Sequence, residues 1–390
     1  MKKLKYSSQT ISKKDIDSVN KVLRSEFLTQ GPKTPAFENK IKALVKCKYA
    51  LATNSASSAL LLACKSLSLK KGDLFWTTPN SFVATANCGI LSGLKIDFVD
   101  IDPNTWNISI KKLENKLKIA KKKKKLPKLI IVVHLGGLAV DPIKLKYLSK
   151  IYKFKIIEDA SHSLGGKYHS KRIGCSKWSD ITIFSFHPVK IITTGEGGCC
   201  TTNNKKYYQK LKALRNNGII KDKKYFKNKN LGPWYYEQHS IGYNFRLNDI
   251  QSSLGLSQLN NLNIFLKKRN NIAKIYHNHL KELPISFQKV EKAFYSTYHL
   301  FIIKLDDKYK HLHKKFFNYL RSKNIFVNLH YLPIHLHPFY KKLGFKKKQF
   351  PEAESYSESS ISIPIYPNLK KKDQIGVINL IKSFLKKYAK

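Results

Sequence analysis

A lysine and an acid, each placed directly after a strongly apolar run, are the residues of this chain best suited to chemistry. Lys190 ends the segment FSFHPVK (184–190) and precedes a glycine-rich turn, and Asp159 lies upstream in EDASH (158–162). A lysine amine can form a Schiff base with an aldehyde, and a carboxylate can keep a pyridine nitrogen protonated so that the ring acts as an electron sink. The pair therefore predicts a site for pyridoxal 5'-phosphate (PLP), with Lys190 and Asp159 as its catalytic residues.

Both positions have alternative interpretations. The chain holds 73 lysines and arginines, so only its setting separates Lys190 from a surface lysine. The apolar run before it indicates an interior position, where burial would lower the pKa of the amine and suit it to carrying protons. Glu158 competes with Asp159 by residue type. Because successive strand residues point to opposite faces, only one of the two can face the site, and we expect Asp159.

Small and aromatic residues nearby could complete the cofactor site. A strand-to-helix turn before Ala56 would present backbone N–H groups to a phosphate, as helix N-termini do. We therefore predict that Ala56, Ser57 and Ser185 bind the cofactor phosphate. Phe82 is predicted to stack on the pyridine ring, and His162 to touch the ring or its phenolic oxygen. The competing interpretations are helix caps for the serines and core positions for Phe82 and His162.

The composition describes a globular chain with an extreme positive charge. Its 390 residues carry a formal net charge of +48, and 42% of them are hydrophobic. A nucleic acid or an anionic membrane could explain such a charge. However, only six of the 73 basic residues are arginine, the usual residue for phosphate and base contacts, and the lysines are scattered. We therefore expect a solvated surface and no specific nucleic-acid partner, with part of the charge steering an anionic substrate.

Cysteine usage and hydropathy bear on location. The six cysteines form no C-x-x-C pair and have no histidine at zinc-finger spacing, so we expect reduced thiols and no metal site. The first ten residues lack the apolar core of a secretory signal, and no run of 18 apolar residues could span a membrane. These features predict a cytoplasmic protein without membrane insertion.

Short apolar runs alternate with helical patterns through most of the chain. Strands are expected at 49–53, 74–78, 95–99, 129–134, 155–158 and 180–186, and helices at 13–23, 34–46, 54–67, 81–91 and 143–152. Near-continuous apolar strands separated by helices predict an α/β fold with a mostly parallel sheet covered by helices on both faces. In such a sheet, functional residues gather beyond the carboxyl ends of the strands, where Asp159 and Ser185 fall.

The last third of the chain has a different pattern, typical of a smaller α+β region. A long helical pattern follows Arg246 and runs to about residue 280. Beyond it we expect strands at 298–305 and 325–329, and helices at 312–321 and at the C-terminus. The predicted domains are residues 1–255, which would bind the cofactor, and residues 256–390. The five lysines at 121–125 are interpreted as an exposed loop or helix end.

Together, these motifs resemble the DegT family of PLP-dependent nucleotide-sugar aminotransferases. The resemblance covers nearly the whole chain and rests on LTQGP (28–32), TPNSFVATAN (78–87), EDASHSLG (158–165), residues 184–198 and GYNFRLN (242–248). It implies the aspartate aminotransferase-like PLP fold, fold type I, in a homodimer with active sites at the subunit interface. Asn244 of the neighbouring subunit would complete the phosphate site. Weaker contacts to the sugar nucleotide are implied for Tyr6, Gln30, Arg246, His330 and Tyr331.

His162 narrows the resemblance, because many members of the family carry glutamine there. With the motifs at 28–32 and 78–87, it is most similar to the branch that aminates a UDP-linked 4-keto-6-deoxy-N-acetyl-hexosamine on the way to pseudaminic acid. The implied reaction takes an amino group from L-glutamate and passes it to the sugar in two half-reactions. Lys190 is retained where related dehydratases have histidine, which favours transamination. Three alternatives stay open: a GDP- or dTDP-linked keto sugar, a ring ketone without a nucleotide, and a non-catalytic nucleic-acid-binding protein with the PLP fold.

Overall fold

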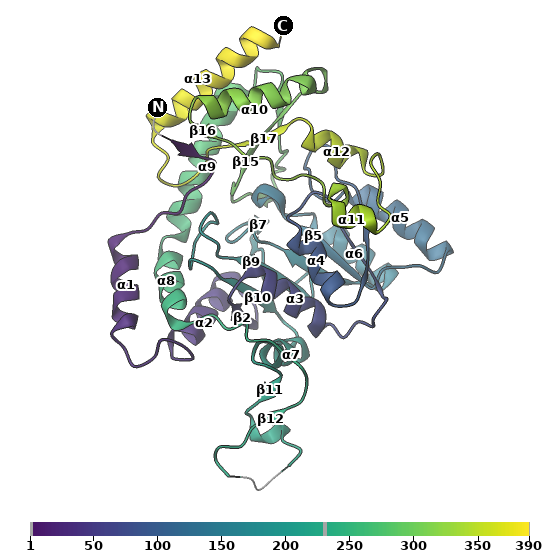
Figure 1. The fold of residues 1–390 in the computed structure, drawn as a ribbon, viewed down its shortest axis with the longest axis vertical. Coiled ribbons are helices and arrows are strands. Elements are labelled where there is room, and N and C mark those ends of the chain that lie inside the picture. Colours follow the sequence, from purple (N-terminus) through teal and green to yellow (C-terminus); the bar gives the residue numbers. More distant parts are fainter. Residues whose placement is uncertain (1–2, 229–231, 390) are drawn as a thin grey trace.

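The computed structural model describes residues 3–228 and 232–389. Within them, the largest sheet has seven strands in the order β2-β10-β9-β6-β5-β3-β4 (Figure 1). Its strands are β2 (Tyr49–Thr53), β3 (Leu74–Thr77), β4 (Lys95–Phe98), β5 (Leu129–Val133), β6 (Lys155–Asp159), β9 (Ile181–Ser185) and β10 (Gly198–Thr202). β10 is antiparallel to its neighbours β2 and β9, and the other neighbouring pairs are parallel. The predicted mostly parallel sheet is confirmed.

Helices cover both faces of this sheet, because side chains alternate along each buried strand. Leu129 and Ile131 of β5 pack in one apolar cluster with α3 (Ala56–Ser66), α4 (Ala84–Leu91) and α7 (Lys205–Arg215). Ile130 and Val132 pack on the opposite face with α5 (Ile110–Lys122) and α6 (Pro142–Tyr152). All four side chains are fully buried, which is why the run reads as continuously apolar.

A second apolar cluster lies at the end of the molecule that holds both chain termini (Figure 1). It joins the antiparallel strands β13 (Ile285–Phe287), β15 (Phe301–Leu305) and β17 (Ser360–Ile363) to helices α9 (Leu262–Leu280), α10 (His313–Ser322) and α13 (Lys371–Tyr388). The first strand, β1 (Leu4–Lys5), pairs in parallel with β16 (Ile325–Phe326). Leu4 and Lys5 therefore pair with a strand from the last third of the chain. The predicted boundary between residues 255 and 256 falls inside α8 (Asp249–Asn260) and stays a prediction.

Other elements complete the fold. The remaining helices are α1 (Lys13–Leu23), α2 (Lys33–Val45), α11 (Pro338–Lys342) and α12 (Pro351–Ser357). The remaining strands are β7 (Lys167–Tyr168), β8 (Lys171–Arg172), β11 (Ile219–Ile220), β12 (Glu237–Gln238) and β14 (Phe294–Tyr295). β11 and β12 form an arm that projects from the base of the molecule (Figure 1).

Two sequence-based expectations need correction. The long helical pattern up to residue 280 is two helices, α8 and α9, which meet at Asn261. The Asn261 N–H bonds to the Gln258 carbonyl, three residues back, so the first helix closes in a tighter turn before the second begins. The strand expected at 325–329 ends at Phe326. Beyond it the chain runs beside β17, where Asn328 forms a bridge with Ser362 and His330 contacts the Ser362 hydroxyl.

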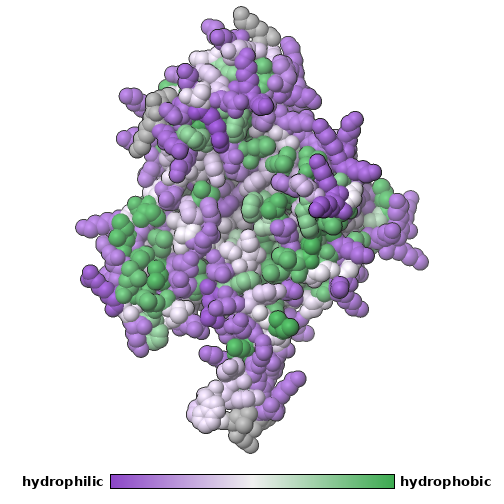
Figure 2. All heavy atoms as spheres, viewed as in Figure 1, coloured by the Kyte–Doolittle hydropathy of each residue, from purple (hydrophilic) through white to green (hydrophobic). Residues whose placement is uncertain are grey.

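Figure 2 shows hydrophilic side chains spread over the visible face, with apolar areas between them. The lysines at 121–125 are all exposed and form the end of α5 and the loop after it. Of the helices described, none combines the length and the apolar character needed to cross a membrane.

Candidate active site

Lys190 and Asp159 line one cavity of about 550 Å³, beyond the carboxyl ends of the parallel strands. Eight other predicted site residues line the same cavity: Tyr6, Ala56, Ser57, Phe82, His162, Ser185, His330 and Tyr331. They come from the main sheet, the start of α3, several loops and the N-terminal segment, so the fold brings together positions far apart in the sequence. The location follows the rule for open α/β sheets, in which ligands bind where strands end.

Lys190 follows β9 in a tight turn. Its backbone N–H donates to the His187 carbonyl at 2.9 Å, and the Ser7 hydroxyl donates to the Val189 carbonyl at 2.9 Å. Burial lowers the pKa of Lys190 from 10.5 to about 8, although the Asp159 carboxylate acts in the opposite direction. A much larger fraction of this amine is therefore unprotonated near neutral pH than in a solvated lysine, and only the unprotonated amine can attack an aldehyde.

Asp159 ends β6 with both carboxylate oxygens engaged. Oδ2 accepts a hydrogen bond from Thr85 Oγ1 at 2.7 Å, and Oδ1 accepts from the N–H (3.1 Å) and the hydroxyl (2.5 Å) of Ser161. These donors orient the carboxylate. Its side chain is 6% exposed, so a cationic ring nitrogen would meet it away from bulk water, where the attraction is strongest.

Glu158 points to the other face of the sheet, as alternation requires. Its Oε2 accepts from the hydroxyls of Ser179 (2.8 Å) and Thr182 (2.6 Å), and its Oε1 lies 3.6 Å from His134 Nε2. Burial by itself raises the pKa of Glu158, but His134 and these hydroxyls together bring it below its ordinary value. Glu158 does not line the cavity with Lys190. The structure therefore places Asp159, and not Glu158, in the cavity, a choice that residue type alone left open.

The N-terminus of α3 forms a cradle for an anion. Ser55 caps the helix by accepting from the Ser58 N–H at 3.1 Å, so Ala56 and Ser57 begin the helix with N–H groups that have no partner within it. A Cβ atom at Gly198 would lie 2.5 Å from the Ser55 carbonyl oxygen, so glycine is needed for this close approach. Gly198 pairs with Ser185 in the sheet, which places the Ser185 hydroxyl at the same edge. Unpaired amides and hydroxyls at a helix N-terminus fit a phosphate.

Aromatic and histidine side chains form another wall of the cavity. Phe82 is 58% exposed, so it is not a core residue within this chain. Its ring lies 6.3 Å from that of Tyr331. The Tyr331 hydroxyl lies 3.3 Å from His162 Nε2, and the ring of Tyr6 meets that of His330 edge-on at 4.8 Å. The loop after β16 contributes His330 and Tyr331 to this wall.

Sequence reasoning missed some residues that position this site. Thr85 follows Phe82 by one helical turn, and this spacing within the 78–87 motif could have indicated it. Asn80, in the same motif, accepts from the Tyr331 N–H through Oδ1 at 3.1 Å. His299, whose ring lies 4.4 Å from that of His162, belongs to no motif and gave no signal.

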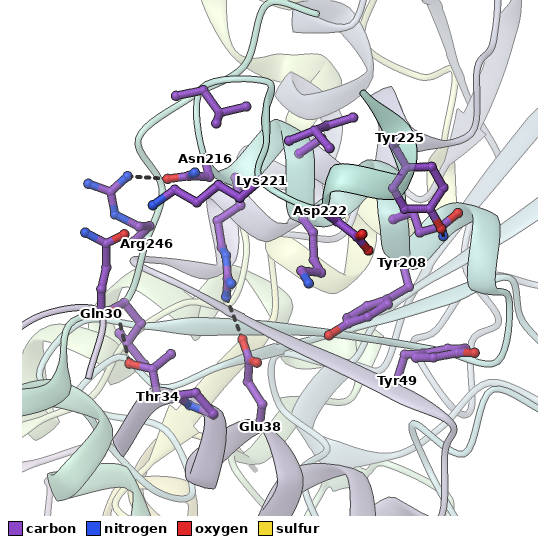
Figure 3. A pocket seen from close by; sticks show the side chains of 18 of the residues that line it. Gln30, Thr34, Glu38, Tyr49, Tyr208, Asn216, Lys221, Asp222, Tyr225 and Arg246 are labelled. Atoms are coloured by element: carbon purple, nitrogen blue, oxygen red, sulfur yellow. Dashed lines mark hydrogen bonds and ion pairs between the residues drawn. The ribbon is translucent and has the colours of Figure 1, made fainter. Parts of the chain in front are cut away.

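Three predicted site residues lie away from Lys190 in this chain. Gln30 and Arg246 line a separate cavity of about 700 Å³ between α2, α7 and the base of the arm, shown in Figure 3. Arg246 donates there to the Asn216 side-chain oxygen at 2.6 Å. Asn244 is exposed and pairs through its backbone with Asn216. One copy of the chain therefore does not bring these residues to the cavity that holds the lysine.

The helix-covered, mostly parallel sheet, with a lysine and an acid in one cavity beyond the strand ends, defines the fold of the PLP-dependent sugar aminotransferases. The chain belongs to the DegT/DnrJ/EryC1/StrS aminotransferase family, whose model matches residues 9–382. The family predicted from the sequence motifs is therefore confirmed.

Individual relatives are similar over their full length. A Campylobacter jejuni protein named UDP-4-amino-4,6-dideoxy-N-acetyl-beta-L-altrosamine transaminase is 37% identical over 389 residues, which are 99% of each chain. The solved structure of Helicobacter pylori PseC, an aminotransferase of pseudaminic acid biosynthesis, superposes with a TM-score of 0.91 at 32% identity, covering 99% of this chain and 100% of that one. A Streptococcus pneumoniae chain described as a sugar aminotransferase, solved in a PLP form, gives 0.89 at 26% identity and 99% coverage of both chains.

Proposed function

We propose that this chain is a PLP-dependent aminotransferase that converts a UDP-linked 4-keto-6-deoxy-N-acetyl-hexosamine to the 4-amino sugar, with L-glutamate as donor. The observation that carries the chemistry is the cavity in which Lys190, with its lowered pKa, and Asp159 meet beside the N-terminus of α3. The sugar class is supported by relatives that share 34–37% identity and carry the altrosamine transaminase name.

Each residue has a separate task in this proposal. When bound, PLP supplies the electron sink that lets a carbon beside nitrogen lose its proton. Lys190 Nζ anchors the aldehyde and, once free, carries the proton between the two carbons. The Asp159 carboxylate holds a proton on the ring nitrogen. Ala56, Ser57 and Ser185 bind the phosphate and so fix the ring against Phe82.

We also propose a homodimer with shared sites. Arg246 lies beside Asn216 at the base of the arm (Figure 3), and Asn244 pairs with Asn216 through its backbone. Neither residue lines the cavity that holds Lys190 of the same chain. A second copy could supply Asn244 to the phosphate site and Arg246 and Gln30 to the sugar nucleotide. Exposed apolar side chains support a surface that is covered in the assembly, because such patches are uncommon on monomers. Trp234 (81% exposed) and Ile241 (87%) lie on the arm, and Leu23 (54%) on α1.

The cysteines bear on the cellular compartment of the protein, and its net charge bears on the substrate. All six cysteines are free and buried, which supports a reducing compartment, the cytoplasm. The net charge of +48 suits a substrate with a diphosphate. A GDP-linked keto sugar is the second candidate, because relatives named GDP-perosamine synthase are 26–28% identical.

The test is an absorbance titration of the purified protein with PLP, then with L-glutamate, for the wild type and Lys190→Ala. The proposal expects the band of lysine-bound cofactor, and its loss on adding glutamate, in the wild type alone. The loaded protein is then offered UDP-, GDP- and dTDP-linked 4-keto sugars side by side. Equal spectra in both proteins would remove Lys190 from its role, and a preference for the GDP sugar would overturn the substrate assignment.

A further inference from the structure

The position of one proton is fixed at the cavity wall. The Gly136 N–H donates to His162 Nδ1 at 3.3 Å, so this nitrogen accepts and carries no hydrogen. Burial lowers the pKa of His162 well below its ordinary value, and nearby Lys190 acts in the same direction, so the ring is neutral. A neutral imidazole whose Nδ1 is an acceptor carries its hydrogen on Nε2.

The position of the hydrogen on His162 also fixes the direction of its hydrogen bond with Tyr331. His162 Nε2 lies 3.3 Å from the Tyr331 hydroxyl oxygen, and since Nε2 holds the hydrogen, the tyrosine oxygen is the acceptor. Burial raises the pKa of Tyr331, which keeps its own proton on the oxygen. Within residues 3–228 and 232–389, no side chain or carbonyl accepts that proton. Tyr331 lines the cavity, so its O–H is left to donate there.

The phenol ring is held from its backbone side. The Tyr331 N–H donates to Asn80 Oδ1 at 3.1 Å, and Asn80 is itself 1% exposed. The preceding residue, His330, is fixed by its Nδ1 contact to the Ser362 hydroxyl at 2.8 Å and by the Tyr356 hydroxyl, which donates to the His330 carbonyl at 2.7 Å. A donor held this way needs little rearrangement when charge develops on its partner.

We propose that the Tyr331 hydroxyl donates a hydrogen bond to the keto oxygen of the sugar and is a catalytic residue of the second half-reaction. This inference rests on the proposed function and deepens it. A ketone oxygen only accepts, so a site offering a donor matches it. The amino group of the product is a donor when protonated, and it meets a tyrosine oxygen whose lone pair already serves His162. The wall thus distinguishes the keto substrate from the amino product.

The contact strengthens as the reaction proceeds. Addition of an amine nitrogen to the sugar carbon would move the C=O π pair onto oxygen, which would gain negative charge. A C=N bond would then replace the C=O bond, and the oxygen would leave as water with the two hydrogens that the amine nitrogen gives up. Tyr331 keeps its own proton throughout and acts by hydrogen bonding, a role whose removal costs about 10²–10³-fold in other enzymes.

The experiment separates the half-reactions by single-turnover absorbance. Tyr331→Phe should slow the reaction of amine-loaded enzyme with the keto sugar by about 10²-fold. It should leave the cofactor spectrum unchanged and the rate with L-glutamate within about threefold. Tyr340→Phe is the matched control, because this buried tyrosine donates to Asn87 Oδ1 at 2.6 Å outside the cavity.

A second pair of variants tests whether residue 162 donates a hydrogen bond to the Tyr331 oxygen, and it leaves the phenol in place. A glutamine at 162 can accept from Gly136 and donate to Tyr331, whereas leucine can do neither. His162→Gln should therefore retain the sugar half-reaction better than His162→Leu, by about tenfold or more.

Three outcomes overturn the inference: Tyr331→Phe reacts with the sugar like the wild type, both half-reactions slow equally, or the cofactor spectrum shifts. The last would assign the hydrogen bond to the phenolic oxygen of the cofactor. Failure of the wild type to react with any keto sugar would instead overturn the proposed function, so the two failures are distinguishable.

Discussion

Thr85 Oγ1 donates to Asp159 Oδ2 at 2.7 Å, which ties the first turn of α4 to the end of β6. The Thr85 hydroxyl also contacts the Ser81 hydroxyl at 2.8 Å, so a short chain of hydrogen bonds leads to the acid. Thr85→Val keeps the shape but removes the donor. Because a hydrogen bond to a charged group contributes about 1.5–3 kcal/mol, we expect transamination to slow by about tenfold or more. Steady-state kinetics of the wild type and Thr85→Val will measure this loss of activity.

Ser92→Ala is the control for this variant, since Ser92 caps the other end of α4 and its hydroxyl donates to the Cys88 carbonyl, away from Asp159. If Thr85→Val and Ser92→Ala both keep full activity, the Thr85 bond does not orient the carboxylate.

The lowered pKa of Lys190 predicts how the cofactor attaches. The amine reacts only when unprotonated, and its pKa is lowered to about 8. The rate of PLP attachment to the cofactor-free protein should therefore rise with pH and level off above about 8, well before the range of an ordinary lysine. Stopped-flow absorbance over a pH series gives the profile. Asp159→Asn removes the group that raises this pKa, so its plateau should begin at lower pH; a profile still rising at pH 10 in the wild type would contradict the assignment.

The buried hydrogen bonds of Arg269 predict an effect on the stability of the fold. Its guanidinium is fully buried in α9 and donates to the carbonyls of Tyr298 (3.3 Å), His299 (3.2 Å) and Ile365 (2.9 Å). Arg269→Met leaves those carbonyls without a donor and should lower the free energy of unfolding by about 2–4 kcal/mol. Urea unfolding measures the loss. Arg24→Met, at an exposed arginine, should change little, and an equal effect in both variants would argue against the buried contacts.

Subunit mixing tests the shared site. Lys190→Ala and Asn244→Ala should each be nearly inactive alone. If Asn244 serves the partner's site, each mixed dimer contains one intact site, and an equal mixture after refolding should recover about a quarter of wild-type activity. Activity is measured against the fraction of each variant. No recovery, despite dimers of both chains, would place Asn244 and Lys190 in the same subunit's site.

Much of the sheet could be predicted because its strands are buried on both faces. β5 reads as a continuous apolar run, and the predicted ends of β5 and β6 differ from the observed ones by one residue. The choice between Glu158 and Asp159 needed the strand register and its neighbours, which residue type does not encode. The sequence pattern did not predict the break at Asn261, because buried residues continue the helical period on both sides of it.

Contacts between distant segments were harder to predict. His299 and Arg269 lie in no motif. The ring of His299 lies beside that of His162, and Arg269 donates to the His299 carbonyl, so both contacts depend on how the last third of the chain packs on the sheet. The motifs placed Gln30 and Arg246 with the substrate, but one chain holds them in another cavity. Assembly, which a single sequence does not display, decides where such residues act.

The pairing of β1 with β16 sets an order for a chain emerging from the ribosome. Leu4 is made long before its partner Ile325. All seven strands of the main sheet, with Lys190 and Asp159, are synthesised before that partner exists. Tyr6 reaches the cavity only after the partner strand has emerged. The nascent protein thus acquires its cofactor residues first, and the wall that would meet the sugar is completed last.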